Sequence, residues 1–254
     1  MDEKINSGTV STPRWGLWGT LFFGFLLLGV WFILDSALTG VYVGITGRAP
    51  SYAEATRSIE ELQFNGFVIS ICAIISSLVC GTLLVAIIKL KKGASIKEYL
   101  GLVRFNSNQV LRWGGLLIAL LIVTDISFVL FGLPIIPEFQ LLIYKSAKYP
   151  LILWFAIVIF APLFEECFFR GFLLKGLSLS FLKPVGAVLT TSVVWAGIHG
   201  QYGLRDIVPI FIFGCLLGAA RVKTGSVSIT ITLHSFANLV SLIETMIYIK
   251  MNMS

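Results

Sequence analysis

The sequence is poor in charged residues. Only 13% of its 254 residues are Asp, Glu, Lys or Arg, whereas 57% are hydrophobic, and a typical soluble domain has about 25% charged residues. Residues 15–34 and 67–88 contain no charged side chain at all. Each run is about as long as the ~20 residues that cross the hydrocarbon core of a bilayer. This composition excludes an ordinary soluble enzyme and indicates an integral membrane protein.

Cysteine and basic patches are scarce as well. The four cysteines fall in apolar runs and form no CxxC pair, which argues against a disulfide framework or a thiolate metal site. We expect them to be small buried side chains. The net charge is +6. Nucleic-acid binding would need a basic patch on a soluble domain, and the sequence predicts no such domain, so a nucleic-acid partner is not expected. The cysteines are Cys72, Cys80, Cys167 and Cys215.

Apolar segments predict an all-α polytopic bundle of about seven spans, which forms a single membrane domain over residues 1–254. The first run is of full span length with no small-residue cleavage pattern after it, so we interpret it as an anchor and expect the mature chain to begin near Met1. Two later segments are short enough to be tilted or buried inside the bundle. After the first two, the expected spans are 113–133, 150–177, 185–200, 207–220 and 226–249.

Lys and Arg residues predict the orientation, because they accumulate in short cytoplasmic loops. Of the nineteen, Arg170 lies inside a predicted span, twelve lie on the side of the N-terminus and six on the other side. This favours a cytoplasmic N-terminus and an external C-terminus. We divide the domain into N-terminal spans and loops (1–149) and a catalytic core (150–250). The polar external loop at 44–65 is a candidate for a short surface helix. The compact chain favours a prokaryotic plasma membrane.

The most unusual stretch is FEECFFRGF, residues 164–172, inside the fourth predicted span. A charge at the centre of a membrane helix costs about 2.5 to 3.5 kcal/mol on insertion scales, and here three occur in six residues. Glu166 and Arg170 are four residues apart and can form an ion pair on one helix face. Glu165 points about 100° away from Glu166, so it needs partners from other spans.

The two histidines of the chain are candidates for those partners. If the helices turn near Leu182, Glu165 and His199 each lie seventeen residues from the turn and are level with one another. His234 and Asn238 are four residues apart and share a helix face. Close helix contact near them is allowed by a small-xxx-small pattern, formed by Gly214 and Gly218.

This set of residues suits amide hydrolysis. A carboxylate in an apolar site can act as general base on a water molecule, and a histidine beside it can position that water. A second histidine and an asparagine amide are suitable donors to an oxyanion. No Ser or Cys nucleophile is needed, and Cys167 faces about 200° away from Glu165 on a helix.

Three motifs resemble those of the CAAX-protease and bacteriocin-processing family, the type II CAAX endopeptidase-like intramembrane proteases. FEECFFRGF resembles the EExxxR motif, WAGIH the second motif, FxxxH, and HSFAN the third motif, HxxxN. They occur in the family's order on separate predicted spans. The resemblance implies a helical membrane fold and glutamate-dependent hydrolysis of a peptide bond, in a peptide or protein substrate with or without a lipid anchor. It implies no cofactor.

The resemblance also implies a role for each motif residue. Trp195 departs from the pattern, because it stands where the family usually has Phe, and its larger ring affects the expected substrate more than the chemistry. The implied roles are general base for Glu165, water positioning for His199, oxyanion donation for His234 and Asn238, and support for Glu166 and Arg170.

Other functions remain open from the residues. Glu165, His199 and His234 offer the His₂Glu set of several catalytic zinc sites, although no HExxH helix accompanies them. A proton-coupled carrier would use buried Glu, His and Arg as a relay, but no internal repeat is visible. A non-catalytic peptide-binding or immunity protein is a further alternative. Among the remaining carboxylates, Asp35 and Asp125 are expected to line the same cavity or lie near span ends, and Glu244 to be interfacial.

Overall fold

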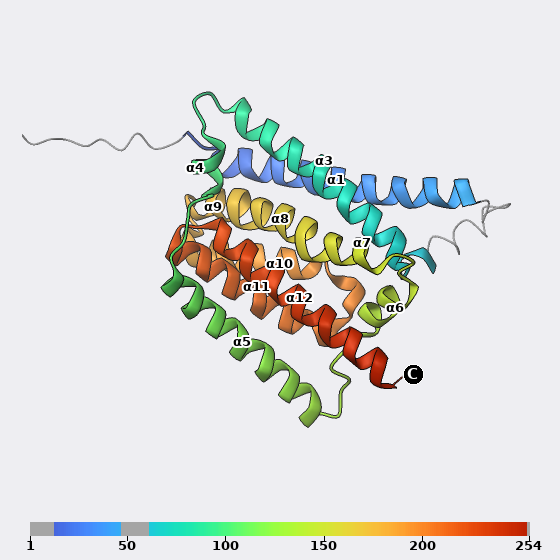
Figure 1. Ribbon diagram of the computed structural model, residues 1–254. Helices are drawn as coiled ribbons and strands as arrows, with labels where there is room; N and C mark the ends of the chain where they lie inside the picture. Colours follow the sequence, from blue (N-terminus) through green and yellow to red (C-terminus); the bar gives the residue numbers. More distant parts are fainter. Residues whose placement is uncertain (1–12, 47–60, 253–254) are drawn as a thin grey trace, which may run out of the picture.

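The computed structural model describes residues 13–46 and 61–252, and the regular elements in these ranges are all helices. The predicted all-α fold is confirmed. Six helices are long and apolar enough to cross a membrane, and they lie alongside one another in one bundle (Figure 1). They are α1 (Leu17–Thr46), α3 (Gly66–Leu90), α5 (Ser107–Leu130), the helix Pro150–Ser178, α11 (Leu204–Thr224) and α12 (Val227–Asn252).

The expected span at 185–200 is helix α10 (Lys183–Gly197), which has only 15 residues. At 1.5 Å per residue it is about 22 Å long, less than the ~30 Å of hydrocarbon, so the count of seven spans is not confirmed by length. Helix α10 packs against α9 (Leu174–Ser178) and α11. The first turn of α1 and the last turn of α12 lie at opposite ends of the bundle (Figure 1). The orientation in the membrane stays a prediction.

The helix Pro150–Ser178 runs through the middle of the bundle and is interrupted by two π-helical segments. Pro162 has no amide hydrogen to donate to the preceding turn, and the π-helical segment η1 before it absorbs this defect. The other π-helical segment, η2, contains Glu166 and Arg170. In order, the segments are α7 (Pro150–Phe155), η1 (Ala156–Phe160), α8 (Ala161–Glu165), η2 (Glu166–Leu173) and α9.

Glycines allow α10 and α11 to approach closely. A Cβ atom on Gly214 would lie 3.1 Å from Cε3 of Trp195, and one on Gly218 would lie 2.8 Å from Cγ1 of Val188. The predicted small-xxx-small contact is therefore present, and its partner is α10. Gly225 then ends α11 with a φ of +70°, a conformation that suits glycine.

Short helices cover both ends of the bundle. Helix α6 (Glu138–Ser146) is fixed to α12 by buried Gln140, whose Nε2 donates to the Ser241 carbonyl (2.8 Å) and the Thr245 hydroxyl (2.6 Å). At the other end, α4 (Ile96–Leu100) is held by Arg221, which donates to the Leu100 carbonyl. Residues 47–60 of the predicted external loop lie outside the described residues.

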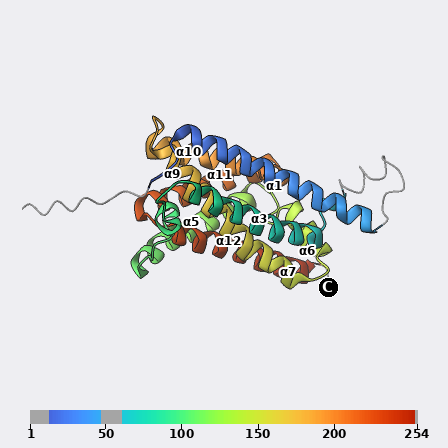
Figure 2. The ribbon, with the colours of Figure 1, turned by 90° about the horizontal axis from the view of Figure 1, so that it is seen from above.

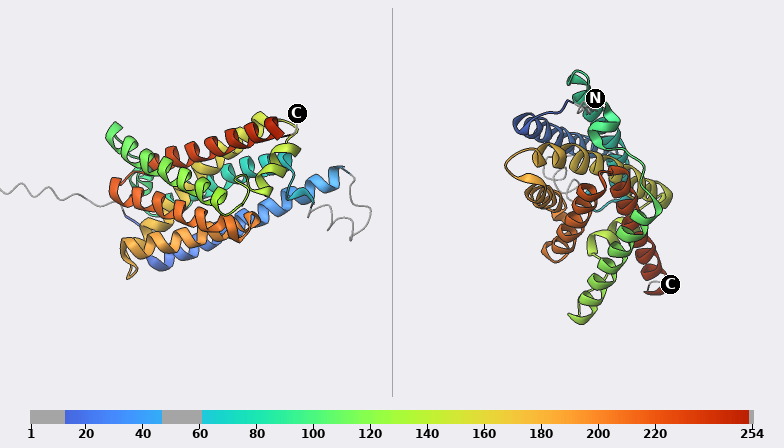
Figure 3. Two further views of the ribbon diagram at one scale, coloured as in Figure 1. Left: turned by 90° about the horizontal axis from the view of Figure 1, so that it is seen from below. Right: turned by 90° about the vertical axis from the view of Figure 1, so that its left-hand side faces the viewer.

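Helix α5 is the most peripheral span. Leu117 is its buried residue, and it packs in a cluster with α11 and α12. The view along the bundle (Figure 3, right) shows α5 at the margin and the helix Pro150–Ser178 among the other helices, and α5 also lies at a margin in the view from above (Figure 2). Glu165, Glu166 and Arg170, which lie on this helix, are buried within the bundle.

Candidate active site

Glu165 and Glu166 are neighbours in the chain, but their side chains face different helices. Oε2 of Glu165 accepts a hydrogen bond from Nε1 of Trp195 on α10, over 2.6 Å. Oε1 of Glu166 lies 2.8 Å from Nη1 of Arg170 and 3.0 Å from Nδ1 of His234 on α12. Both carboxylates are buried, Glu166 completely. Each therefore has its own set of partners, as the 100° offset on a helix requires.

Trp195 connects most of the site. Its ring centroid lies 4.9 Å from that of His199 and 5.3 Å from that of His234, both edge to face. The guanidinium of Arg170 lies 4.6 Å from the same indole, a cation–π contact in a desolvated setting. Together with the hydrogen bond to Glu165, these contacts place one indole between the base candidate, two histidines and a buried cation.

The hydrogen bonds of His199 indicate its tautomer. It follows the last turn of α10, and its Nδ1 lies 2.7 Å from the Trp195 carbonyl oxygen. A carbonyl oxygen only accepts, so Nδ1 carries the hydrogen, and in the neutral ring Nε2 is an acceptor. His199 also interacts electrostatically with Glu165. The histidine is thus suited to accept a hydrogen bond from a water molecule close to that carboxylate.

His234 and Asn238 lie one turn apart on α12, and both bind the central helix. His234 is oriented by Glu166, as described above. Nδ2 of Asn238 donates to the Ile157 carbonyl over 2.8 Å, within π-helical η1. That nitrogen has a second hydrogen, so the bond fixes the amide and leaves a donor.

Arg170 is the largest completely buried side chain among the described residues. The predicted ion pair with Glu166 is present, and Nη2 also donates to the Gly214 carbonyl over 3.3 Å. Within the described ranges, Oε2 of Glu166 and Nε of Arg170 are buried without a hydrogen-bond partner. Such atoms are rare in folded proteins and are expected where a water molecule or a substrate completes the site.

Comparison with known proteins finds a family match over part of the chain. Residues 147–240 match the family described as type II CAAX prenyl endopeptidase Rce1-like. Over these residues the predicted family is confirmed. The chain also resembles an uncharacterized 24.3 kDa protein of Escherichia coli, with 29% identity over 101 residues. The match covers 39% of this chain and 46% of that relative, and no solved structure matches.

The Rce1-like segment contains every residue of the predicted site. Six of these residues form one connected cluster, and Asn238 binds the central helix about two turns before Glu165. The match extends from the segment before α7 into α12, so it covers the helices that carry the three motifs. The six connected residues are Glu165, Glu166, Arg170, Trp195, His199 and His234.

Each residue of the alternative zinc set uses one polar atom for a protein partner and keeps a second polar atom available. Nδ1 of His234 donates to Glu166, and one oxygen of Glu165 accepts from Trp195. Among the described residues, no group of three or more His, Cys, Asp or Glu side chains is arranged to hold a metal ion. We therefore derive no step through a metal from these residues.

A hollow of about 710 Å³ lies beside the Rce1-like site, between α6, α12 and the segment η3 (Gly200–Tyr202). Tyr202 lines it, and the ring centroid of Tyr202 is 6.1 Å from that of His199, so the hollow adjoins the site. Phe139 and Tyr248 add aromatic surface, and Arg205 contributes a cation that is paired with Asp206. The hollow is on the side of the bundle where α12 ends.

Three further acidic residues lie elsewhere in the bundle. Asp35 of α1 interacts with Cys72 of α3, and Asp125 of α5 interacts with Glu244 of α12. Neither of these contacts involves the cluster around Trp195. All four cysteines are free, and Cys72 and Cys80 are buried.

The sequence did not predict the contact between Glu165 and Trp195. Counting seventeen residues on each side of Leu182 pairs Glu165 with His199, but the hydrogen bond goes to Trp195, one turn earlier. A π-helix advances less per residue than an α-helix, so η2 shortens the distance along the axis from the turn to Glu165. The sequence did contain one signal for this hydrogen bond. Trp stands at position 195 where the family usually has Phe, and an indole has an N–H to donate whereas a phenyl ring has none.

Proposed function

We propose that the protein is an intramembrane endopeptidase in which Glu165 activates the water that hydrolyses a peptide bond. The observation that supports this most is the hydrogen bond from Trp195 to one oxygen of Glu165. It fixes the carboxylate and leaves the other oxygen for a proton. The Rce1-like match over residues 147–240 gives independent support for CAAX-type peptide hydrolysis.

In the proposed reaction, water lies between Glu165 and Nε2 of His199. Glu165 takes a proton from this water as the oxygen attacks the scissile carbonyl carbon. The carbonyl oxygen becomes an oxyanion, and Asn238 donates to it with the hydrogen that does not bind Ile157. Glu165 then passes the proton to the departing amine, which restores the carboxylate and completes hydrolysis with one water consumed.

His234 acts as the second oxyanion donor in this proposal. Its Nδ1 hydrogen binds Glu166, so Nε2 can donate only when the ring carries both hydrogens. Glu166 accepts from Nδ1 and fixes the orientation of the ring, so that Nε2 faces away from the ion pair. Arg170 in turn balances the charge of Glu166. The buried ion pair thus supports the oxyanion donor, and the base acts separately.

The substrate in this proposal is a membrane-associated peptide whose flanking residues occupy the hollow lined by Phe139, Tyr202 and Tyr248. Aromatic walls suit apolar side chains. The proposal also includes location in a prokaryotic plasma membrane, a substrate with or without a lipid anchor, and a reaction without a cofactor.

The test is cleavage of a membrane-peptide library by the purified full chain in detergent, with products identified by mass spectrometry. We expect defined cleavage by the wild type and a loss of about 10² to 10⁴ in rate for Glu165→Gln, the range for removal of a general base. Asp125→Asn is the matched control, because it neutralises an intramembrane carboxylate outside the site. Equal rates for Glu165→Gln and wild type would overturn the proposal.

A further inference from the structure

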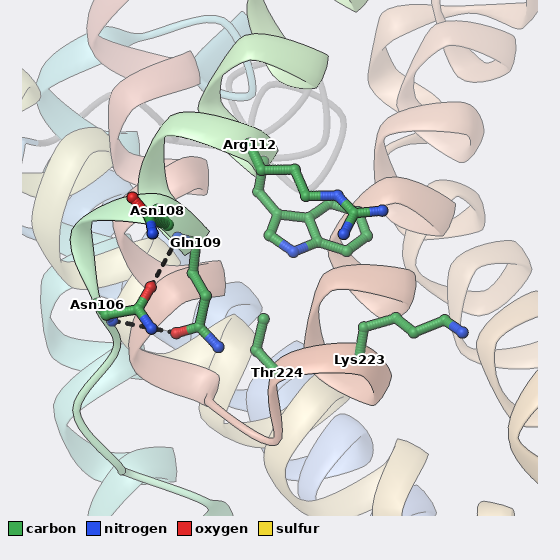
Figure 4. A pocket seen from close by; sticks show the side chains of 7 residues that line it. Asn106, Asn108, Gln109, Arg112, Lys223 and Thr224 are labelled. Atoms are coloured by element: carbon green, nitrogen blue, oxygen red, sulfur yellow. Dashed lines mark hydrogen bonds between the residues drawn. The ribbon is translucent and has the colours of Figure 1, made fainter.

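A second hollow, of about 450 Å³, lies at the other end of the bundle, where α5 begins and α11 ends (Figure 4). We call it the basic hollow. It has two cations, one indole and four amide or hydroxyl side chains, and none of its lining residues is acidic. They are Asn106, Asn108, Gln109, Arg112, Trp113, Lys223 and Thr224.

No ion pair within the described residues balances the charge of the basic hollow. The ion pairs of the described residues do not include Arg112 or Lys223. In Figure 4 the two side chains extend from α5 and α11 toward the same side of the hollow. Two neighbouring cations without an acidic partner produce a local potential that attracts an anion.

The capping box of α5 supplies hydrogen-bond donors to the same place. Oδ1 of Asn106 accepts from the Gln109 amide, and Oε1 of Gln109 accepts from the Asn106 amide. The oxygen of each side chain is therefore occupied, and each NH₂ group keeps its hydrogens for another acceptor. Cations together with amide donors suit the oxygens of a phosphate group.

The position of the basic hollow favours a lipid over a free anion. Its residues lie in the first turns of one span and the last turn of another, which is the level of the headgroups in a bilayer. Exposed apolar side chains continue from it along the spans, with Leu116 and Val123 on α5 and Ile212 on α11. An acyl chain would contact this surface while Trp113 lies at the interface.

We propose that the basic hollow binds the phosphate of an anionic phospholipid, with Arg112 and Lys223 as the charged contacts. In the predicted orientation this end of the bundle is cytoplasmic, where anionic lipids attract basic residues with about 1 kcal/mol each. The proposal is independent of peptide hydrolysis and of the residues around Trp195.

The test is native mass spectrometry of the full chain in detergent with added phosphatidylglycerol or phosphatidylcholine. We expect the wild type to retain phosphatidylglycerol preferentially. Removal of both cations, in Arg112→Gln with Lys223→Gln, is expected to weaken its binding roughly 30-fold. The control removes two exposed cations outside the hollow at the same end, in Lys92→Gln with Lys97→Gln, and is expected to bind like the wild type.

Three outcomes would overturn the proposal. Equal binding of the two lipids would exclude recognition of the anionic headgroup. An equal loss in the control pair would mean general attraction by net charge. Displacement of the lipid by millimolar glycerol 3-phosphate or inorganic phosphate would show that Arg112 and Lys223 bind a soluble phosphate and not a lipid. Circular dichroism and the elution volume of each variant check that it is folded.

Discussion

Nε1 of Trp195 lies 2.6 Å from Oε2 of Glu165, and both groups are buried between α8 and α10. The same indole contacts the rings of His199 and His234. One side chain thus fixes the proposed base and contacts both histidines of the chain. A phenylalanine at this position would keep most of the ring contacts but would have no hydrogen for the carboxylate.

Trp195→Phe tests this contact. A hydrogen bond to a charged group contributes about 1.5–3 kcal/mol, so we expect kcat to fall by about 10- to 100-fold, with a small change in KM. The measurement is steady-state cleavage of a peptide found in the library. Trp18→Phe is the control, because Trp18 is 80% exposed. An unchanged kcat in Trp195→Phe would show that the hydrogen bond does not assist the base.

Arg170→Met tests the buried ion pair. Removal of one partner leaves the Glu166 charge without its cation in the interior, a cost of about 3–5 kcal/mol. We expect a marked fall in the thermal unfolding midpoint in detergent. The double variant Glu166→Gln with Arg170→Met removes both charges, so we expect it to regain much of the loss. If the double variant is as unstable as the single one, lost packing and not the unpaired charge is responsible.

Gly214→Ala tests the close approach of α10 and α11. The added Cβ would lie 3.1 Å from both Cε3 of Trp195 and Cβ of Ser192, so α10 must shift and carry the indole away from Glu165. We expect lower activity than in Gly115→Ala. Gly115 has open space around it, and alanine there favours the helix by up to about 1 kcal/mol. Equal activity of both variants would show that the site tolerates movement of α10.

Much of the fold follows from hydrophobic runs. Long apolar segments predicted the spans, because no other structure satisfies the backbone inside a bilayer as simply as a helix. The four-residue spacing of Glu166 and Arg170 predicted their ion pair. That pair is retained although η2 is π-helical, since four residues are close to one turn in either helix. Span ends were less accurate, as α11 begins at Leu204, before Pro209.

The details of the site depend on features that a periodic pattern does not encode. The π-helical segments η1 and η2 change the register of the central helix, so the level of Glu165 against α10 could not be counted from the turn. The bond from Asn238 to the Ile157 carbonyl depends on η1 in the same way. The contact of Glu165 with α10 and the bond from Asn238 to Ile157 each join distant parts of the chain. Sequence spacing predicts only which residues share one face of a helix.

The central claim is that Glu165, without a metal ion, activates the attacking water. The most direct measurement is the initial cleavage rate of wild type and Glu165→Gln, each with and without 1,10-phenanthroline. We predict that the chelator leaves the wild-type rate unchanged and that Glu165→Gln shows the same large loss of rate with and without it. A wild-type rate that is lost with the chelator and restored by Zn²⁺ would contradict the claim and assign metal-binding roles to His199 and His234.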